Sequence, residues 1–243
     1  MPSVEPSQSQ QPESQLQRAV EVMDRLRSPG GCPWDAEQTH ESLTRYLLEE
    51  TYEVLEAIET ADLALLREEL GDLLLQVLFH ARIASELPPE DGRFGIEDVA
   101  GDLADKLIAR HPHVFADVRV ASVQEQTELW EELKVAEKGR TSAVDGVPLA
   151  QPALALTAKL IARADRAGVT AHASGDLTQR VATSNSPLGT RSRHSAGSSE
   201  DELGLRLFEL VREAVAAGVD PEAALRRTAR AFRDAIVAAE SAQ

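Results

Sequence analysis

Residues 63–86 read LALLREELGDLLLQVLFHARIASE, and beyond Asp72 the helix that this stretch predicts is apolar on nearly every face. Such a helix has to be covered on all sides, so we expect it at the centre of a helical bundle. It nevertheless carries two carboxylates, Glu69 and Asp72, three residues apart. Because burying an unpaired carboxylate costs free energy, this pair is expected to be protonated, ion-paired or bound to a metal.

The preceding segment predicts a helix over about residues 40–60 and carries five glutamates within the thirteen residues LLEETYEVLEAIE. At about 100° per residue, Glu50 and Glu53 fall about 60° apart on one shoulder of the apolar stripe of this helix. The other glutamates of the run lie further round and are expected to face solvent. The positions assigned to the stripe are Leu43, Leu47, Thr51, Val54, Leu55 and Ile58.

The short turn TADLA makes the two helices antiparallel neighbours, which can place Glu50 and Glu53 opposite Glu69 and Asp72. Four converging carboxylates form a hard-oxygen cage that suits Mg²⁺ or Mn²⁺ and differs from a Cys/His zinc set. The alternative is a salt-bridged bundle surface, because glutamates are frequent on helices and one E-x-x-E pair is a weak signal. Two pairs on consecutive helices, one of them in apolar surroundings, favour the metal site.

The rest of the chain also predicts helices, so the expected fold class is all-α. Its apolar residues are mostly Ala, Leu and Val, aromatic residues make up 4%, and no segment alternates convincingly between apolar and polar residues. Further helices are expected at about residues 16–26, 96–111 and 123–139, and over about a dozen residues ending at Arg166. In the loop SPGGCPWDAEQTH, Asp35 with Gln38 is expected to form the N-cap of the helix that follows.

The net charge and the cysteine content indicate which partners and which compartment to expect for this protein. The formal net charge of −16 argues against binding a nucleic-acid polymer, which requires cationic patches. The single cysteine, Cys32, has no internal disulfide partner, which suits a reducing cytoplasm. No apolar run reaches the roughly 18 residues of a membrane span, and MPSVEPSQSQQPESQ lacks the regions of a signal peptide. We therefore expect a cytoplasmic protein with no membrane partner.

The acidic residues form the pattern EExxE followed by ExxD: Glu49, Glu50 and Glu53, then Glu69 and Asp72. With the surrounding GCPWDAEQTHESL, YLLEETYEV, LREELGDLLLQVLFHA and DKLIARHPHVF, this pattern resembles the MazG family of nucleoside triphosphate pyrophosphohydrolases, in the all-α NTP pyrophosphatase superfamily. The resemblance covers about residues 16–166. It implies a MazG-type helical bundle and Mg²⁺-dependent hydrolysis, with Mn²⁺ also possible, of an NTP or dNTP at the α-phosphorus to nucleoside monophosphate and pyrophosphate.

The resemblance also implies roles for particular residues. Glu50, Glu53, Glu69 and Asp72 become the metal ligands, and Glu49 either acts on the attacking water or is simply exposed. Lys106 and Arg110 share a helix face and fit the family's phosphate-contacting positions, with ordinary exposed charge as the alternative. Trp34 and Asp35 are candidates for contacts to the base or sugar, although Trp34 can equally fill the bundle and Asp35 cap a helix. We assign His111 and His113 to structure, and the single Glu37-x-x-His40 falls short of the two such motifs of a ferritin-like di-iron bundle.

Full-length members resemble two tandem MazG domains, and this chain keeps a trace of the second. DELGLRLFELVREA aligns with EELGDLLLQVLFHA, which puts Leu205 in the place of Asp72, and the preceding EExxE helix is missing. A weaker alignment puts Ala231 and Ala235 against Lys106 and Arg110. We therefore expect the second copy to be catalytically dead and retained for packing or dimerisation, although in the family the second domain most clearly carries activity.

These observations predict five parts: a disordered tail (1–14), a MazG domain (15–140), a connecting helix (141–167), a disordered linker (168–199) and a degenerate partial second repeat (200–243). In the last part, Asp220 and Pro221 are expected as N-cap and first residue of the final helix. A homodimer is expected, because one MazG half has too few helices to close a site and cover its apolar helix.

The leading prediction is an NTP pyrophosphohydrolase that clears non-canonical or excess nucleotides. A close alternative is a specialised relative, such as a dUTP or phosphoribosyl-ATP pyrophosphohydrolase. A third hypothesis is a catalytically weak, nucleotide-binding regulatory protein, against which the complete set of four acidic ligands argues.

Overall fold

The computed structural model describes residues 14–116, 118, 121–122, 125–126, 130, 141–170, 177 and 199–242. All elements within these residues are helical, which confirms the predicted all-α fold class. The contacts divide the chain into two units, residues 1–130 and residues 131–243. The predicted tail (1–14), the helix expected at 123–139 and the linker (168–199) lie almost wholly outside the described residues, and the five predicted domain limits stay predictions.

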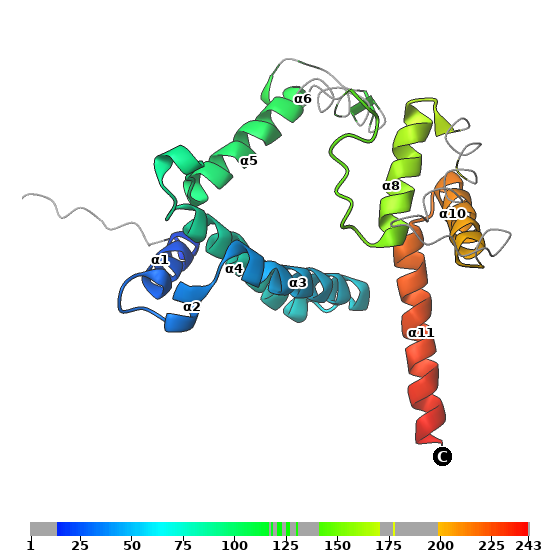
Figure 1. The fold of residues 1–243 in the computed structure, drawn as a ribbon, viewed down its shortest axis with the longest axis horizontal. Coiled ribbons are helices and arrows are strands. Elements are labelled where there is room, and N and C mark those ends of the chain that lie inside the picture. Colours follow the sequence, from blue (N-terminus) through cyan, green and yellow to red (C-terminus); the bar gives the residue numbers. More distant parts are fainter. Residues whose placement is uncertain are drawn as a thin grey trace, which may run out of the picture. The chain divides into compact units, whose positions relative to one another are not determined.

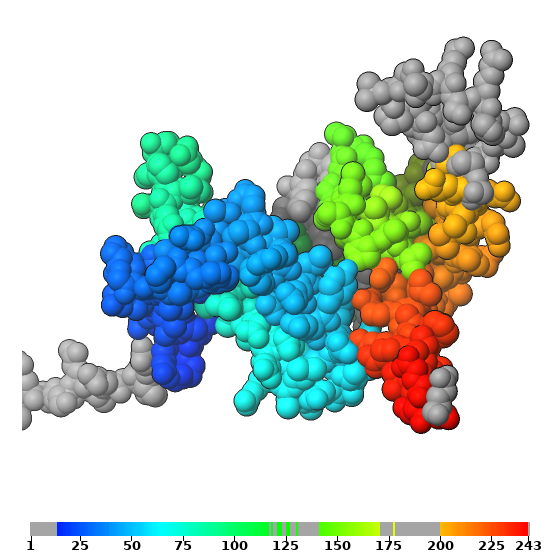
Figure 2. Space-filling view, turned by 60° about the horizontal axis from the view of Figure 1, so that its bottom comes forward, coloured from blue at the N-terminus to red at the C-terminus, as the bar shows by residue number. Residues whose placement is uncertain are grey.

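Unit 1 is organised around a helical hairpin. Helices α3 (His40–Thr60) and α4 (Leu63–Ala84) lie side by side, and α1 (Gln15–Arg27) and α5 (Ile96–Arg110) contact α4 (Figure 1). The short elements are α2 (Pro33–Glu37), the 3-10 turn η1 (Pro89–Asp91) and α6 (Pro112–Phe115). In the space-filling view, the side chains of the hairpin, blue to cyan, form one continuous block (Figure 2).

Side-chain caps determine where the hairpin helices begin. Thr39 Oγ1 accepts a hydrogen bond from the Ser42 amide at 3.2 Å while Ser42 Oγ accepts one from the Thr39 amide at 2.9 Å, which forms a capping box at the start of α3. Ala61, at a φ of 56°, ends α3 in the left-handed region. Asp62 Oδ1 then accepts hydrogen bonds from the amides of Ala64 and Leu65, both at 3.0 Å, and starts α4. Two residues therefore suffice to reverse the chain.

The prediction that Asp35 caps α3 is wrong. Asp35 lies inside the separate short helix α2 and is buried, with 9% of its surface exposed. The physical reason is Pro33, whose fixed φ suits the first position of a helix and starts a turn six residues before the cap of α3. Thr39 takes the capping role because Ser42 completes its capping box.

Arg27 fixes the loop before α3. Its guanidinium donates to the carbonyl oxygens of Asp35 and Gln38, and its Nε lies 2.9 Å from Glu86 Oε1 beyond the end of α4. The Arg27 side chain is only 4% exposed, whereas that of Glu86 is 40% exposed. The same loop needs glycine at position 31, because a Cβ there would lie 2.2 Å from the Leu26 carbonyl oxygen. The loop is therefore held firmly against α1 and α4.

The core of unit 1 lies at the end of the hairpin where α3 begins. Met23, Leu43, Leu78 and Phe79 form a buried cluster that joins α1, α3 and α4. Towards the TADLA turn, the predicted apolar stripe of α3 is only partly covered, because within this unit α3 packs mainly on α4. Of the residues assigned to this stripe, Leu43 is buried, whereas Leu47, Thr51 and Ile58 are exposed. Leu70, Leu74 and Val77 of α4 are also exposed.

Unit 2 contains α8 (Ala153–Arg166), α10 (Ser199–Ala216) and α11 (Pro221–Ser241), and α8 contacts both of the others. Ile161 of α8 and Val211 of α10 are buried at 3% and 2% exposure. Asp220 Oδ1 accepts hydrogen bonds from the amides of Glu222 and Ala223, and Pro221 is the first residue of α11. The prediction of this cap is confirmed.

Candidate functional site

The α3–α4 hairpin brings three of the four predicted metal ligands together. Glu50 of α3 and Glu69 and Asp72 of α4 each offer a carboxylate oxygen, and these oxygens all lie within 4.8 Å of one another. Glu69 is buried at 8% exposure, while Glu50 and Asp72 are half-buried. Among the described residues, no other group of three His, Cys, Asp or Glu side chains meets this criterion.

The neighbouring negative charges and burial raise the proton affinity of Glu50 and Glu69. Burial, a hydrogen bond with Glu53 and the negative charges of Asp72, Glu53 and Glu69 raise the pKa of Glu50 to about 7. Burial raises the pKa of Glu69 as well, with the charges of Glu53, Asp72 and Glu68 adding to the effect. Like charges at this separation in a partly dry site are unfavourable unless a proton or a cation joins them. The site is therefore electrostatically suited to a cation.

Glu53 lies beside this cluster. Its side chain is exposed and is not one of the three whose oxygens converge, yet its negative charge helps to raise the pKa of both Glu50 and Glu69. Glu53 therefore lies near the cluster, and its role as a ligand stays a prediction. Glu49, the predicted helper of the attacking water, is exposed on α3. Its role stays a prediction.

Trp34 lines a shallow hollow with Arg45 and Leu48 of α3. Its ring makes edge-on contacts with Tyr46 and Phe79, at centroid distances of 6.0 and 6.3 Å, and half of its surface is exposed. On a helix, Arg45 and Leu48 point about 140–160° away from Glu50. The hollow therefore lies on the opposite side of α3 from the carboxylates of the same chain, and contact of Trp34 or the buried Asp35 with a base or sugar stays a prediction.

The predicted phosphate contacts both lie on α5. Lys106 is exposed and Arg110 is half-buried. Their role stays a prediction. Beyond them, His111 Nδ1 lies 2.6 Å from the Leu107 carbonyl oxygen, and the ring of His113 lies 5.6 Å from that of His111. The bond of His111 to the backbone agrees with the structural role that the sequence suggests for this histidine.

Sequence reasoning missed the polar residues that continue the acidic face of α4. Gln76 is 3% exposed, and His80, one turn further on, has its Nδ1 atom 2.7 Å from His40 Nδ1 of α3. The two imidazole rings stack with 5.0 Å between centroids. The spacing of Glu69, Asp72, Gln76 and His80 along one helix face could have revealed this row of polar groups. Gln76 and His80 were hidden because the segment around them is apolar on nearly every face.

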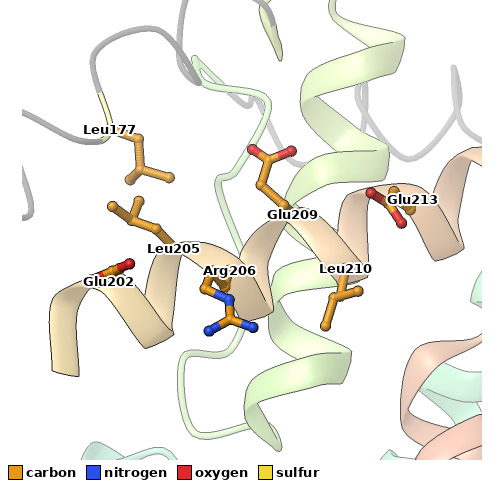
Figure 3. A pocket seen from close by; sticks show the side chains of 7 residues that line it. All are labelled: Leu177, Glu202, Leu205, Arg206, Glu209, Leu210 and Glu213. Carbon is orange, nitrogen blue, oxygen red and sulfur yellow. The ribbon is translucent and has the colours of Figure 1, made fainter. Parts of the chain in front are cut away.

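In unit 2, the segment predicted to be a second repeat has a different character at the position that the prediction aligns with the acidic cluster. A pocket there is lined by Leu177, Glu202, Leu205, Arg206, Glu209, Leu210 and Glu213. Figure 3 shows Leu205, which aligns with Asp72, pointing toward Leu177. Leu205 is apolar and offers no ligand to a cation. That this segment is a second repeat stays a prediction.

Comparisons with known proteins bear on both units. A model of the MazG nucleotide pyrophosphohydrolase domain matches residues 38–115, which include α3, α4 and α5. An uncharacterised 26.1 kDa protein of Streptomyces cacaoi is 46% identical over 243 residues, covering 99% of this chain and 89% of that protein. A nucleoside triphosphate pyrophosphohydrolase of Mycobacterium tuberculosis is 51% identical over 166 residues, covering 68% of this chain and 50% of that protein.

A third relative extends the similarity to most of both chains. The nucleoside triphosphate pyrophosphohydrolase/pyrophosphatase MazG of Thermotoga maritima is 39% identical over 219 residues, which cover 89% of this chain and 82% of that protein. Separately, none of the described helices is both long and apolar enough to cross a membrane. With the matching domain model and this extent of identity, the chain belongs to the MazG family of nucleotide pyrophosphohydrolases.

Proposed function

We propose that this enzyme hydrolyses nucleoside and deoxynucleoside triphosphates at the α-phosphorus to the monophosphate and pyrophosphate, using Mg²⁺ or, in its place, Mn²⁺. The observation that carries the proposal is the convergence of Glu50, Glu69 and Asp72 within 4.8 Å between α3 and α4. Relatives named as nucleoside triphosphate pyrophosphohydrolases support the choice of substrate. Clearing non-canonical or excess nucleotides is the proposed role in the cell.

The donor set fits a hard divalent cation. All three converging ligands are carboxylates, Glu53 is within hydrogen-bonding reach of two of them, and the raised pKa of Glu50 reflects negative charge that a cation would neutralise. When bound, such a cation neutralises charge on the phosphate oxygens and lowers the pKa of water. We assign Glu50, Glu53, Glu69 and Asp72 as its ligands.

Other residues of the chain act on the substrate in this proposal. Lys106 and Arg110 on α5 contact the triphosphate oxygens, because cationic side chains offset the charge of that group. Trp34 and Asp35 contact the base or sugar. Glu49, exposed one residue before Glu50, orients or deprotonates the attacking water.

We also propose that the enzyme works as a homodimer in the cytoplasm. The exposed apolar residues of the hairpin, among them Ile58 of α3 and Leu70, Leu74 and Val77 of α4, form faces that unit 1 by itself leaves uncovered. A second copy of the same hairpin offers a matching surface, as twofold symmetry requires. In unit 2, Leu205 and the missing EExxE helix leave the second repeat without its ligands, so we assign activity to the first repeat.

The proposal can be tested by hydrolysing a panel of NTPs and dNTPs in ¹⁸O-labelled water, with and without Mg²⁺. Attack at the α-phosphorus places the label in the nucleoside monophosphate and releases unlabelled pyrophosphate. Release of orthophosphate, or label in pyrophosphate, would rule out the proposed bond cleavage. Equal rates in Mg²⁺ and in excess chelator would rule out the proposed cofactor.

A further inference from the structure

Gln76 is a buried polar residue whose acceptor is unused in the structure. The residue is 3% exposed, and its Oε1 atom is buried without a hydrogen-bond partner among the described residues. A buried acceptor that has lost water and gained no partner lowers the stability of a fold. Because such groups are rare in native proteins, each one calls for a physical explanation.

The position of Gln76 relates it to the acidic cluster. It follows Asp72 by four residues and Glu69 by seven, so all three project from one face of α4. This face packs against α3, which supplies Glu50. Gln76 is therefore one helical turn deeper in the hairpin than the nearest carboxylate, on the side toward the core.

Its neighbours on α4 do not satisfy this acceptor. His80, one turn further along, has a buried Nε2 that also lacks a partner, and its Nδ1 is engaged with His40. Gln76 and His80 thus do not hydrogen-bond each other. Asp72 and Glu69 are acceptors when ionised and have no hydrogen to donate to Oε1. Among the described residues, no group therefore donates to Gln76 Oε1.

We propose that Gln76 Oε1 accepts a hydrogen bond from the hydration shell of the divalent cation held by Glu50, Glu69 and Asp72. The proposal rests on the metal site of the proposed function. Mg²⁺ prefers six oxygen ligands and usually keeps several waters, whose hydrogens need acceptors. The buried amide oxygen of Gln76 would be such an acceptor. By accepting this hydrogen bond it would help to orient the water ligands, which makes Gln76 a positioning residue.

If the proposal is right, Gln76 lowers the stability of the metal-free protein and raises its affinity for the metal. Without metal, the unpartnered Oε1 lowers the stability of the fold. Gln76→Met keeps the length of the side chain and removes the amide. We therefore expect the melting temperature of the metal-free variant to be unchanged or higher. With metal, the same change removes a hydrogen bond to the ligand shell. We expect Mn²⁺ affinity, measured from the electron paramagnetic resonance signal of free Mn²⁺, to fall about tenfold to a hundredfold.

Gln38→Met is the matched control, because Gln38 Nε2 donates to the Trp34 carbonyl oxygen at 2.9 Å and Ser42 Oγ donates to Gln38 Oε1 at 2.8 Å. This variant should show the reverse pattern, a lower melting temperature with unchanged Mn²⁺ affinity. Gln76→Asn, which keeps an amide, should recover part of the affinity that Gln76→Met loses.

Unchanged Mn²⁺ affinity in Gln76→Met would overturn the proposal. So would a lower melting temperature of the metal-free variant, since that would show that Oε1 is already hydrogen-bonded without metal. Because the readouts are metal binding and melting, they separate this proposal from the proposed reaction: a wild-type protein that binds Mn²⁺ in the predicted way but releases no pyrophosphate would refute only the reaction.

Discussion

At the scale of single residues, the acidic cluster lowers the stability of the metal-free fold. Glu50, Glu69 and Asp72 converge where water is partly excluded, and Glu53 adds a fourth negative charge beside them. Nothing in the packing of the hairpin requires carboxylates at these positions, because apolar residues of similar size would cover the same faces. The cost is offset only when a cation or protons enter the cluster.

Metal-free protein should therefore lose stability as pH rises. The ordinary pKa of Glu50 is 4.5, whereas in the fold it is about 7, so the folded state binds more protons between these two values. The free energy of unfolding should fall across this window, by on the order of 3 kcal/mol, and the loss should be complete above about pH 7. Denaturant unfolding in the presence of a chelator, at a series of pH values, measures this change in the free energy of unfolding.

The control for this prediction is Glu50→Gln, which cannot ionise. Its free energy of unfolding should vary less with pH over the same window, and Mg²⁺ should no longer stabilise it at pH 8. If wild type and Glu50→Gln gave parallel curves, the raised pKa of Glu50 would be refuted.

At the scale of elements, the loop between α1 and α3 decides how the hairpin meets α1. Gly31→Ala should destabilise the protein by about 3 kcal/mol or more, because the added Cβ would lie 2.2 Å from the Leu26 carbonyl oxygen and the backbone would have to move. Gly101→Ala in α5 is the matched control, since a Cβ there meets nothing within 4 Å. It should be neutral or stabilising by up to about 1 kcal/mol, as alanine favours helix. Thermal unfolding of both variants distinguishes a steric cause from a general intolerance of substitution.

The capping box of α3 gives a second prediction for this element. Thr39→Ala removes the acceptor for the Ser42 amide and should cost about 1 kcal/mol of unfolding free energy. Thr44→Ala, on the exposed side of the same helix, should change stability much less. Equal effects of the two substitutions in denaturant unfolding would contradict the assignment of Thr39 as the cap.

The elements also show what the sequence can and cannot predict. The helix predicted at residues 40–60 is observed as α3. The prediction succeeded because the apolar residues of this segment recur at helical spacing. The sequence also predicted that Glu50 lies near Glu69 and Asp72, because a two-residue turn makes the two helices antiparallel neighbours. Asp35 was misplaced because two capping signals lie four residues apart. Pro33, which starts α2, and Ser42, which completes the capping box of Thr39, decide between them.

Burial on α3 was harder to predict, since it depends on which partners are present. Leu47 and Ile58 fit an apolar stripe, but within the described part of the chain no element covers them. Gln76 was missed because the apolar residues around it hide its spacing from Asp72 and His80, and only the structure shows that its Oε1 atom is buried without a partner among the described residues.

At the scale of the whole molecule, the uncovered faces of the hairpin predict the oligomeric state. Leu74→Lys puts a charge in the middle of the exposed apolar row of α4 and should shift the protein from dimer to monomer in analytical ultracentrifugation. Val22→Lys, at an exposed apolar residue of α1, should leave the dimer intact. A wild-type protein that sediments as a monomer at micromolar concentration would contradict the dimer.

The most direct test of the acidic cluster is Mg²⁺-dependent release of pyrophosphate from deoxynucleoside triphosphates by wild type, Glu69→Gln and Glu56→Gln. Glu69 is buried in the cluster, whereas Glu56 lies exposed on α3 outside it, so the two substitutions remove the same charge from different places. We predict that Glu69→Gln lowers the rate by about 100-fold or more while Glu56→Gln keeps the wild-type rate within about twofold. Full activity in Glu69→Gln would contradict the assignment of the site.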